Sequence, residues 1–305
     1  MTHTRDIYIY PRASSRGMTF SPAARMTIIY IFLFIFLFIF LYYLLFRKTT
    51  YIKYLSINEF KNITSSSDFF NNMNSYDLQV RKSNNNNEYL KKYQLGYRAF
   101  TMQQKTILAN IVNIINNKIN KYNNFKNIKW IFVKIDTNLE NSYPHTIENV
   151  IVLSNNFFNY SLKSQINTII HEKVHIYQRI YPEYINILYN RWGFKKVEVD
   201  FNYNRNNPDI KYYYTYNNNL LIQLYNNNPI ELYDSDTYFI DLENNNKIII
   251  DKNIIKQYNL PDIYINKLEH PSEIMAEIIS LYLTNSYHKN DKWIIILKKW
   301  MDNYF

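Results

Sequence analysis

The chain has 305 residues, of which 47% are hydrophobic, and it carries a formal net charge of +10. This length is enough for one folded domain with additional segments, and the hydrophobic content excludes a wholly disordered chain. Cysteine is absent, which excludes disulfide bonds and cysteine-based zinc sites, so any metal must bind histidine and carboxylate side chains. The lysines are scattered among Asn and Ile without a basic block, so we expect a generally basic surface and no nucleic-acid partner.

The N-terminal part of the chain is predicted to anchor it in a membrane. Residues 1–26 form a short basic tail, and Thr27 to Phe46 contain no charge and consist mainly of Ile, Phe and Leu. At 1.5 Å per helical residue this stretch spans about 30 Å, the thickness of one bilayer core. It therefore predicts a transmembrane helix over residues 27–46 and a single-pass membrane protein. Basic residues flank the span almost equally, and its early position favours a lumenal or extracellular C-terminal domain.

The rest of the chain is predicted to contain a polar stalk and one mixed domain. Residues 47–95 are rich in Ser and Asn, which is typical of a linker. Residues 96–305 show the periodic apolar patterns of a folded α+β domain. Apolar residues repeat at helical spacing over residues 98–122, and two apolar runs, Trp130 to Ile135 and Val150 to Leu153, are predicted strands.

Residues 197–251 are predicted to form a β-rich insert in this domain. Runs rich in Tyr and Ile alternate there with three Asn triplets. Asn tolerates the left-handed backbone conformations of tight turns. We therefore expect an antiparallel meander.

A histidine-rich helix is predicted to begin after the N-cap Ser161 and to continue to about Ile180. It carries His171-Glu172-Lys173-Val174-His175, an H-E-x-x-H pattern. Positions i and i+4 share one helix face, so two imidazoles can bind one zinc ion while Glu172 reaches a water at the open position. A single histidine is more often structural, but this helix is apolar nearly all round, and its buried polar stripe needs partners. The stripe consists of Ser164, Thr168, His171, His175 and Gln178.

A second mostly apolar helix is predicted to begin at Pro271, and its polar stripe includes Glu273 and Glu277. Two mostly apolar helices with one polar stripe each should pack with the stripes facing, and Ala276 would let the helix backbones approach closely. Glu273 would then complete a His₂Glu ligand set, and Glu277 would accept the free ring N–H of a ligating histidine. The alternative for both glutamates is a solvated acidic face without metal.

His171-Glu172-x-x-His175 with a distant Glu273-x-x-x-Glu277 resembles the gluzincin metallopeptidases, the thermolysin-like branch of the zincins. The resemblance implies a zincin-like strand–helix–helix core over residues 128–180 and 270–286, with zinc as cofactor. It also implies that Glu273 is a zinc ligand and that Glu277 supports a histidine.

The resemblance further implies that Val150 to Leu153 is the edge strand at which a peptide substrate pairs. Pro144-His145-Thr146 and Gln178 are similar to features of viral and algal zincin-like proteins. The separation of His175 from Glu273 is far longer than in thermolysin, so the resemblance assigns no role to residues 197–251.

The sequence therefore predicts a membrane-anchored zinc metallopeptidase that acts on peptide or protein substrates. Zinc would polarise the carbonyl and activate water, and Glu172 would act as the general base. His145 and His270 are candidate donors to the transition-state oxyanion, although either could equally be structural. The alternative is a membrane-anchored structural or binding protein that keeps zinc for stability. An unligated Glu172 favours the enzyme, because a purely structural site has no use for it.

Overall fold

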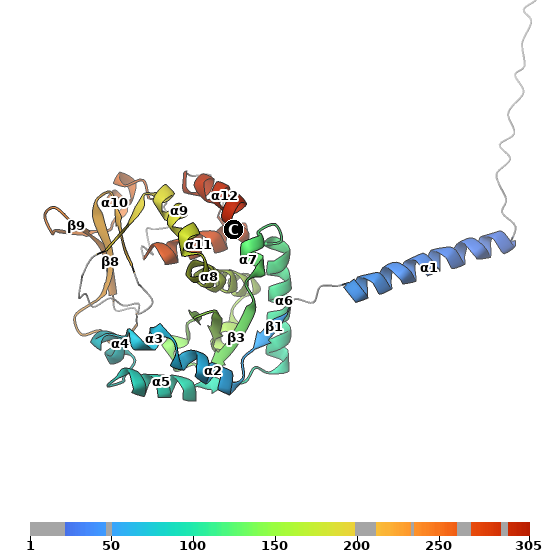
Figure 1. The fold of residues 1–305 in the computed structure, drawn as a ribbon, viewed down its shortest axis with the longest axis horizontal. Helices are drawn as coiled ribbons and strands as arrows, with labels where there is room; N and C mark the ends of the chain where they lie inside the picture. The colour runs from blue at the N-terminus through green and yellow to red at the C-terminus, as the bar shows by residue number, and fades with distance from the viewer. Residues whose placement is uncertain (1–21, 47–50, 199–211, 233–234, 261–269, 288–291) are drawn as a thin grey trace, which may run out of the picture. The chain divides into compact units, whose positions relative to one another are not determined.

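The computed structural model describes residues 22–46, 51–198, 212–232, 235–260, 270–287 and 292–305. The chain divides into two compact units, Met1–Thr49 and Thr50–Phe305. In the first unit the described residues form one helix, α1 (Pro22–Phe46). The second unit has a mixed α+β fold with two five-stranded sheets (Figure 1).

The structure contradicts the predicted membrane anchor. Within the described residues, no helix combines the length and the apolar composition that crossing a membrane requires. The predicted transmembrane helix over residues 27–46 and the membrane localisation are corrected accordingly. Residues 1–21 of the predicted basic tail lie outside the described residues.

The first sheet is built around β3 (Trp130–Ile135). β1 (Ile52–Tyr54) and β5 (Val150–Leu153) lie parallel to β3, and β4 (His145–Ile147) pairs antiparallel with β5 at the edge. β2 (Tyr97–Arg98) pairs antiparallel with the end of β3. Both predicted strands are confirmed, but the prediction that Val150 to Leu153 is the edge strand is wrong. β5 has a partner strand on each side, and β4 is the edge.

Helices cover both faces of this sheet. Successive side chains of a strand point to opposite faces, and Trp130 and Phe132 belong to one core while Ile131 and Val133 belong to another. The first core includes residues of α6 (Met102–Lys118), α7 (Asn123–Asn127) and α8 (Leu162–Ile180). α6 and α8 therefore confirm the predicted helices, with α6 shorter at both ends than the range 98–122.

The second core lies where a polar stalk was predicted. The four N-terminal helices are α2 (Ile57–Ser65), α3 (Asp68–Asn71), α4 (Ser75–Val80) and α5 (Asn86–Leu95). In Figure 1 they gather on the side of β3 opposite α8. Residues 51–95 thus differ from the predicted linker, because their aromatic side chains bury apolar surface against the sheet. These side chains are Phe60, Phe69, Phe70, Tyr89 and Tyr93.

The second sheet confirms an antiparallel insert. Its strand order is β10-β9-β8-β7-β6, and each neighbouring pair is antiparallel. Asn217, Asn218 and Asn245 have positive φ, as expected for Asn in tight turns. Residues 199–211 of the predicted insert lie outside the described part of the chain. The strands are β6 (Phe194–Val197), β7 (Tyr213–Tyr216), β8 (Asn219–Tyr225), β9 (Ser235–Asp241) and β10 (Lys247–Ile249).

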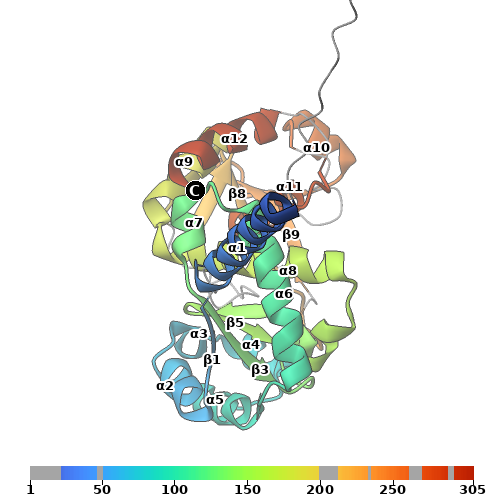
Figure 2. The ribbon, with the colours of Figure 1, turned by 90° about the vertical axis from the view of Figure 1, so that its right-hand side faces the viewer.

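The C-terminal helices complete the first core on the side of α8 away from the sheet. α11 packs against α8, and α12 packs against α9; Figure 2 shows α9 and α12 together at the end of the unit opposite α2 and α5. Two short 3₁₀ turns, η1 (Glu140–Ser142) and η2 (Asn155–Asn159), flank β4 and β5. The helices are α9 (Pro182–Trp192), α10 (Lys252–Gln257), α11 (Pro271–Leu283) and α12 (Lys292–Tyr304).

Candidate metal centre

α8 presents two histidines on one face. Its N-terminus is capped as predicted, since the Ser161 hydroxyl accepts a hydrogen bond from the backbone N–H of Ser164 at 3.2 Å. The rings of His171 and His175 lie 4.8 Å apart, and their Nε2 atoms are separated by 3.0 Å. Both Nε2 atoms therefore face a common point beside the helix.

α11 brings a carboxylate to that point. Pro271 occupies the first turn of α11, as predicted, and Ala276 is fully buried. The Oε2 atom of Glu273 lies 3.2 Å from Nε2 of His171 and 3.2 Å from Nε2 of His175. Three side chains from two helices, separated in sequence by residues 176–272, are thus the group that the described chain offers to a metal ion.

These three atoms fit a zinc ion. Tetrahedral zinc with ligand distances of about 2.0–2.2 Å separates neighbouring ligand atoms by roughly 3.3–3.6 Å. The observed separations of 3.0–3.2 Å need to widen by only a few tenths of an ångström. Two imidazoles and one carboxylate leave a fourth position for water or substrate, which is the ligand set of catalytic rather than structural zinc sites.

Each histidine has a partner at its other ring nitrogen. Nδ1 of His171 lies 3.5 Å from Oε2 of Glu277, where an outer acceptor was predicted. Nδ1 of His175 lies 2.9 Å from Oε1 of Gln178. Gln178 was predicted as part of the polar stripe and as similar to a feature of zincin-like proteins, but without this contact. Its position three residues after His175 was the available signal for the contact.

The side chains of the cluster shift one another's pKa values. Burial acts to lower the pKa of His171, but hydrogen bonds to Glu273 and Glu277 outweigh it and raise this pKa to about 10. Burial acts to raise the pKa of Glu273, but the two histidines hold it well below its usual range. The carboxylates that shift these pKa values would equally attract a metal cation.

Glu172 is close to the cluster but not part of it. Its side chain is buried, and its charge acts to raise the pKa of both histidines. Its carboxylate makes no hydrogen bond to the described residues, whereas Glu273 contacts both histidines. Glu172 thus places a buried negative charge near the two histidines.

The two histidines predicted as oxyanion donors make local hydrogen bonds. Nδ1 of His145 donates to the Tyr143 carbonyl at 2.9 Å, and Nε2 accepts from the Tyr93 hydroxyl at 2.6 Å. His270 is the N-cap of α11, and its Nε2 donates to the Tyr212 carbonyl at 3.0 Å. Burial lowers the pKa of His270 to about 4, so the ring is neutral at physiological pH. The structure thus places His270 at the start of α11, three residues before Glu273, and His145 on strand β4.

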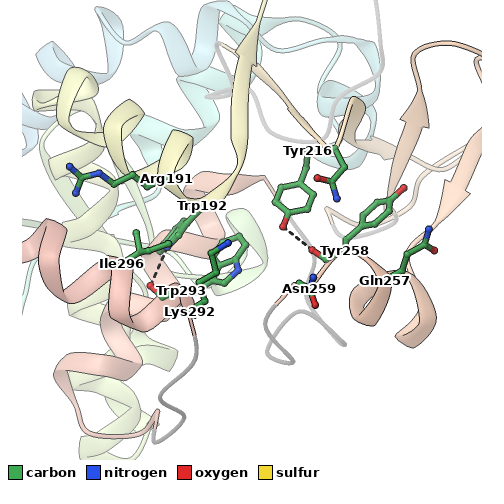
Figure 3. A pocket seen from close by; sticks show the side chains of 10 residues that line it. Arg191, Trp192, Tyr216, Gln257, Tyr258, Asn259, Lys292, Trp293 and Ile296 are labelled. Atoms are coloured by element: carbon green, nitrogen blue, oxygen red, sulfur yellow. Dashed lines mark hydrogen bonds between the residues drawn. The ribbon is translucent and has the colours of Figure 1, made fainter.

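A separate hollow lies between the end of α9, the β7–β8 turn, the end of α10 and the start of α12 (Figure 3). Its volume is about 220 Å³, and it contains none of the metal-cluster residues. The Trp192 indole N–H donates to the Trp293 carbonyl at 3.2 Å, and the Tyr216 hydroxyl donates to the Tyr258 carbonyl at 2.8 Å. These bonds fix the aromatic walls of the hollow.

The fold and this cluster define a mixed α+β protein with a candidate His₂Glu metal centre. No protein-family model matches the chain. No curated protein and no solved structure matches it either.

Proposed function

We propose that this chain is a zinc-dependent metallopeptidase with a zincin-like core formed by the first sheet, α8 and α11. The observation that carries the proposal is the convergence of His171, His175 and Glu273 at 3.0–3.2 Å, with Glu172 beside them. Two neutral donors and one anion suit zinc, and the open fourth position suits catalysis.

The residues of the chain divide the work of peptide hydrolysis. A zinc ion held by His171, His175 and Glu273 would supply Lewis acidity and make water more acidic. Glu172 accepts the proton of the attacking water and later delivers it to the leaving amine. Glu277 and Gln178 hold the ring orientations of the two histidines through their Nδ1 atoms.

The open edge of the first sheet is the proposed binding site for a peptide substrate. β4 pairs with β5 on one side only, so within the described residues its other side is an open strand edge. An extended peptide can add to such an edge through main-chain hydrogen bonds. Arg179, on the same helix as the histidines, donates to the Glu148 carbonyl at 2.8 Å and so ties α8 to the β4–β5 hairpin.

The Glu172→Gln substitution tests the proposal. Glutamine keeps the size of the side chain but cannot accept the proton, so zinc content should be unchanged while hydrolysis of a peptide library falls by at least about 10²–10⁴-fold. Glu183→Gln, an exposed glutamate at the start of α9, is the matched control and should retain activity. Equal hydrolysis by the Glu172→Gln variant and the wild type would refute the assignment.

The second candidate function is a structural or binding protein that keeps zinc for stability. The observation in its favour is that the ring nitrogens of His145 and His270 are already hydrogen-bonded, so neither presents a free N–H to an oxyanion. Under this alternative, chelation lowers the melting temperature, and the wild type cleaves no peptide.

A further inference from the structure

Gln178 uses both ends of its amide to connect the two helices of the metal centre. Its Oε1 lies 2.9 Å from Nδ1 of His175, and its Nε2 lies 2.8 Å from the backbone carbonyl of Ser272. The Nε2 group also lies 3.4 Å from the Tyr189 hydroxyl, which is a weaker contact. Ser272 directly precedes Glu273, so one side chain contacts a histidine ligand and the backbone that carries the carboxylate ligand.

The Ser272 carbonyl fixes the orientation of this amide. A carbonyl oxygen can only accept a hydrogen bond, so the amide group facing it must be NH₂. The amide oxygen then faces His175, and Nδ1 of His175 must be the donor. The proton on Nδ1 leaves a lone pair on Nε2, the atom that faces His171 and Glu273.

We infer that Gln178 is the positioning residue of the metal centre. It selects the His175 tautomer that binds metal through Nε2, and it holds the first turn of α11 so that Glu273 meets both histidines. This inference rests on the proposed zinc site. One uncharged side chain thus performs both tasks at His175. His171 differs, because its Nδ1 faces a carboxylate, that of Glu277 on the opposite helix.

The arrangement is reciprocal between the helices. α11 supplies the carboxylate that supports a histidine of α8, and α8 supplies the amide that holds the start of α11. Because Gln178 adds no charge, it orients His175 without adding a third anion to a centre that already has Glu273 and Glu277. Loss of Gln178 should therefore weaken metal binding in two ways: Glu273 is held less well in position, and the His175 tautomer is no longer selected.

The test measures zinc affinity by chelator competition in the full chain. Gln178→Leu removes both hydrogen bonds and should weaken zinc binding by about 10–100-fold, the usual effect of losing an outer partner. Gln178→Glu keeps the acceptor for His175 and should lose less affinity. Gln165→Leu is the matched control, because Gln165 is a buried glutamine of α8 that donates to the Phe157 carbonyl at 3.2 Å, away from the cluster.

Nitrogen NMR of the zinc-loaded protein supplies a readout that a merely structural role would not change. The wild type and Gln178→Glu should show a slowly exchanging Nδ1–H on His175, and Gln178→Leu should lose that protection. If Gln178→Leu does not fold, the wild-type spectrum decides, since an unprotonated Nδ1 on His175 would overturn the inference. Wild-type zinc affinity in the Gln178→Leu variant would overturn only the inference about Gln178. A wild-type protein that binds no zinc would refute the proposed function as well.

Discussion

Replacing Arg81 with methionine should strongly destabilise the folded chain, because Arg81 is the cation of a buried network. Nε and Nη2 of Arg81 donate to the two carboxylate oxygens of Glu140 at 2.8 and 2.9 Å, and Nη1 donates to Asp77 at 3.2 Å. Asp77 also accepts from the Tyr225 hydroxyl at 3.0 Å, so the network joins α4 to β8. The Asp77 side chain is fully buried, and that of Arg81 is 5% exposed.

The expected loss follows from the charges that remain. Methionine fills much of the volume but leaves two buried carboxylates without a counter-ion. Breaking a buried pair in this way costs about 3–5 kcal/mol of unfolding free energy. The loss of unfolding free energy should not be twice as large for two carboxylates as for one, because a carboxyl group without a cation can take up a proton.

The loss should also depend on pH. Burial acts to raise the pKa of Glu140, but Arg81, together with His145 and a hydrogen bond from Tyr89, holds this pKa below the ordinary value of 4.5. A lowered carboxyl pKa gives stability that is present above pH 4.5 and is lost as the pH falls through the folded-state pKa. Burial raises the pKa of Asp77 and Arg81 acts against this rise, so the removal of Arg81 should raise the Asp77 pKa further. The difference between wild type and Arg81→Met should therefore shrink below pH 4.5.

Urea denaturation at pH 7 and pH 4 measures both effects, with equal m-values as the check that the unfolding transition is unchanged. Lys121→Met is the control, because the Lys121–Asp302 pair is 3.3 Å long with side chains 65% and 62% exposed. Solvent screens such a pair, so this variant should have nearly wild-type stability. A loss below about 1 kcal/mol for Arg81→Met would show that the buried pairs are not formed as ions.

The two glutamates of α11 should differ in a zinc competition assay: Glu273→Ala should lose most of the zinc affinity, and Glu277→Ala should lose roughly 10–100-fold. The reverse order would mean that their roles are exchanged. Gly193→Ala should lower the unfolding free energy by about 1–2 kcal/mol, because Gly193 ends α9 at φ 101° and an added Cβ would lie 3.0 Å from the Tyr216 ring. Wild-type stability of this variant in thermal unfolding would disprove the strain argument.

The residues of the cluster could be predicted from the sequence because their signals are local. H-E-x-x-H places His171 and His175 on one helix face by geometry alone. The polar stripe of α11 within an apolar helix then required a polar partner, and α8 had the matching stripe. The double contact of Gln178 could not be predicted, because it depends on how the start of α11 meets the end of α8.

The N-terminal helices were missed because their composition resembles a linker. Ser and Asn there form helix caps: Ser56 with Glu59 and Asn74 with Asp77 make two complete capping boxes. A second signal was β3, whose six residues are all buried. A strand that is apolar on both faces needs cover on both faces, and α6 and α8 could cover only one. The edge strand was misassigned because β4 has only three residues and gives a weak pattern.

Lys173, in the middle of the histidine motif, helps to keep the two histidines of the helix facing α11. Its side chain is fully buried on the opposite side of α8, where Nζ donates to the Ile128 carbonyl at 2.5 Å and lies 3.8 Å from the centre of a ring of Trp130. Burial lowers the pKa of Lys173 well below its ordinary value, and the amine can donate to the carbonyl in either protonation state. α8 is thus held by Lys173 on the sheet side and by Gln178 on the α11 side. A rotation of the helix by one residue, about 100°, would break both contacts together, so the helix can present its histidines in only one direction.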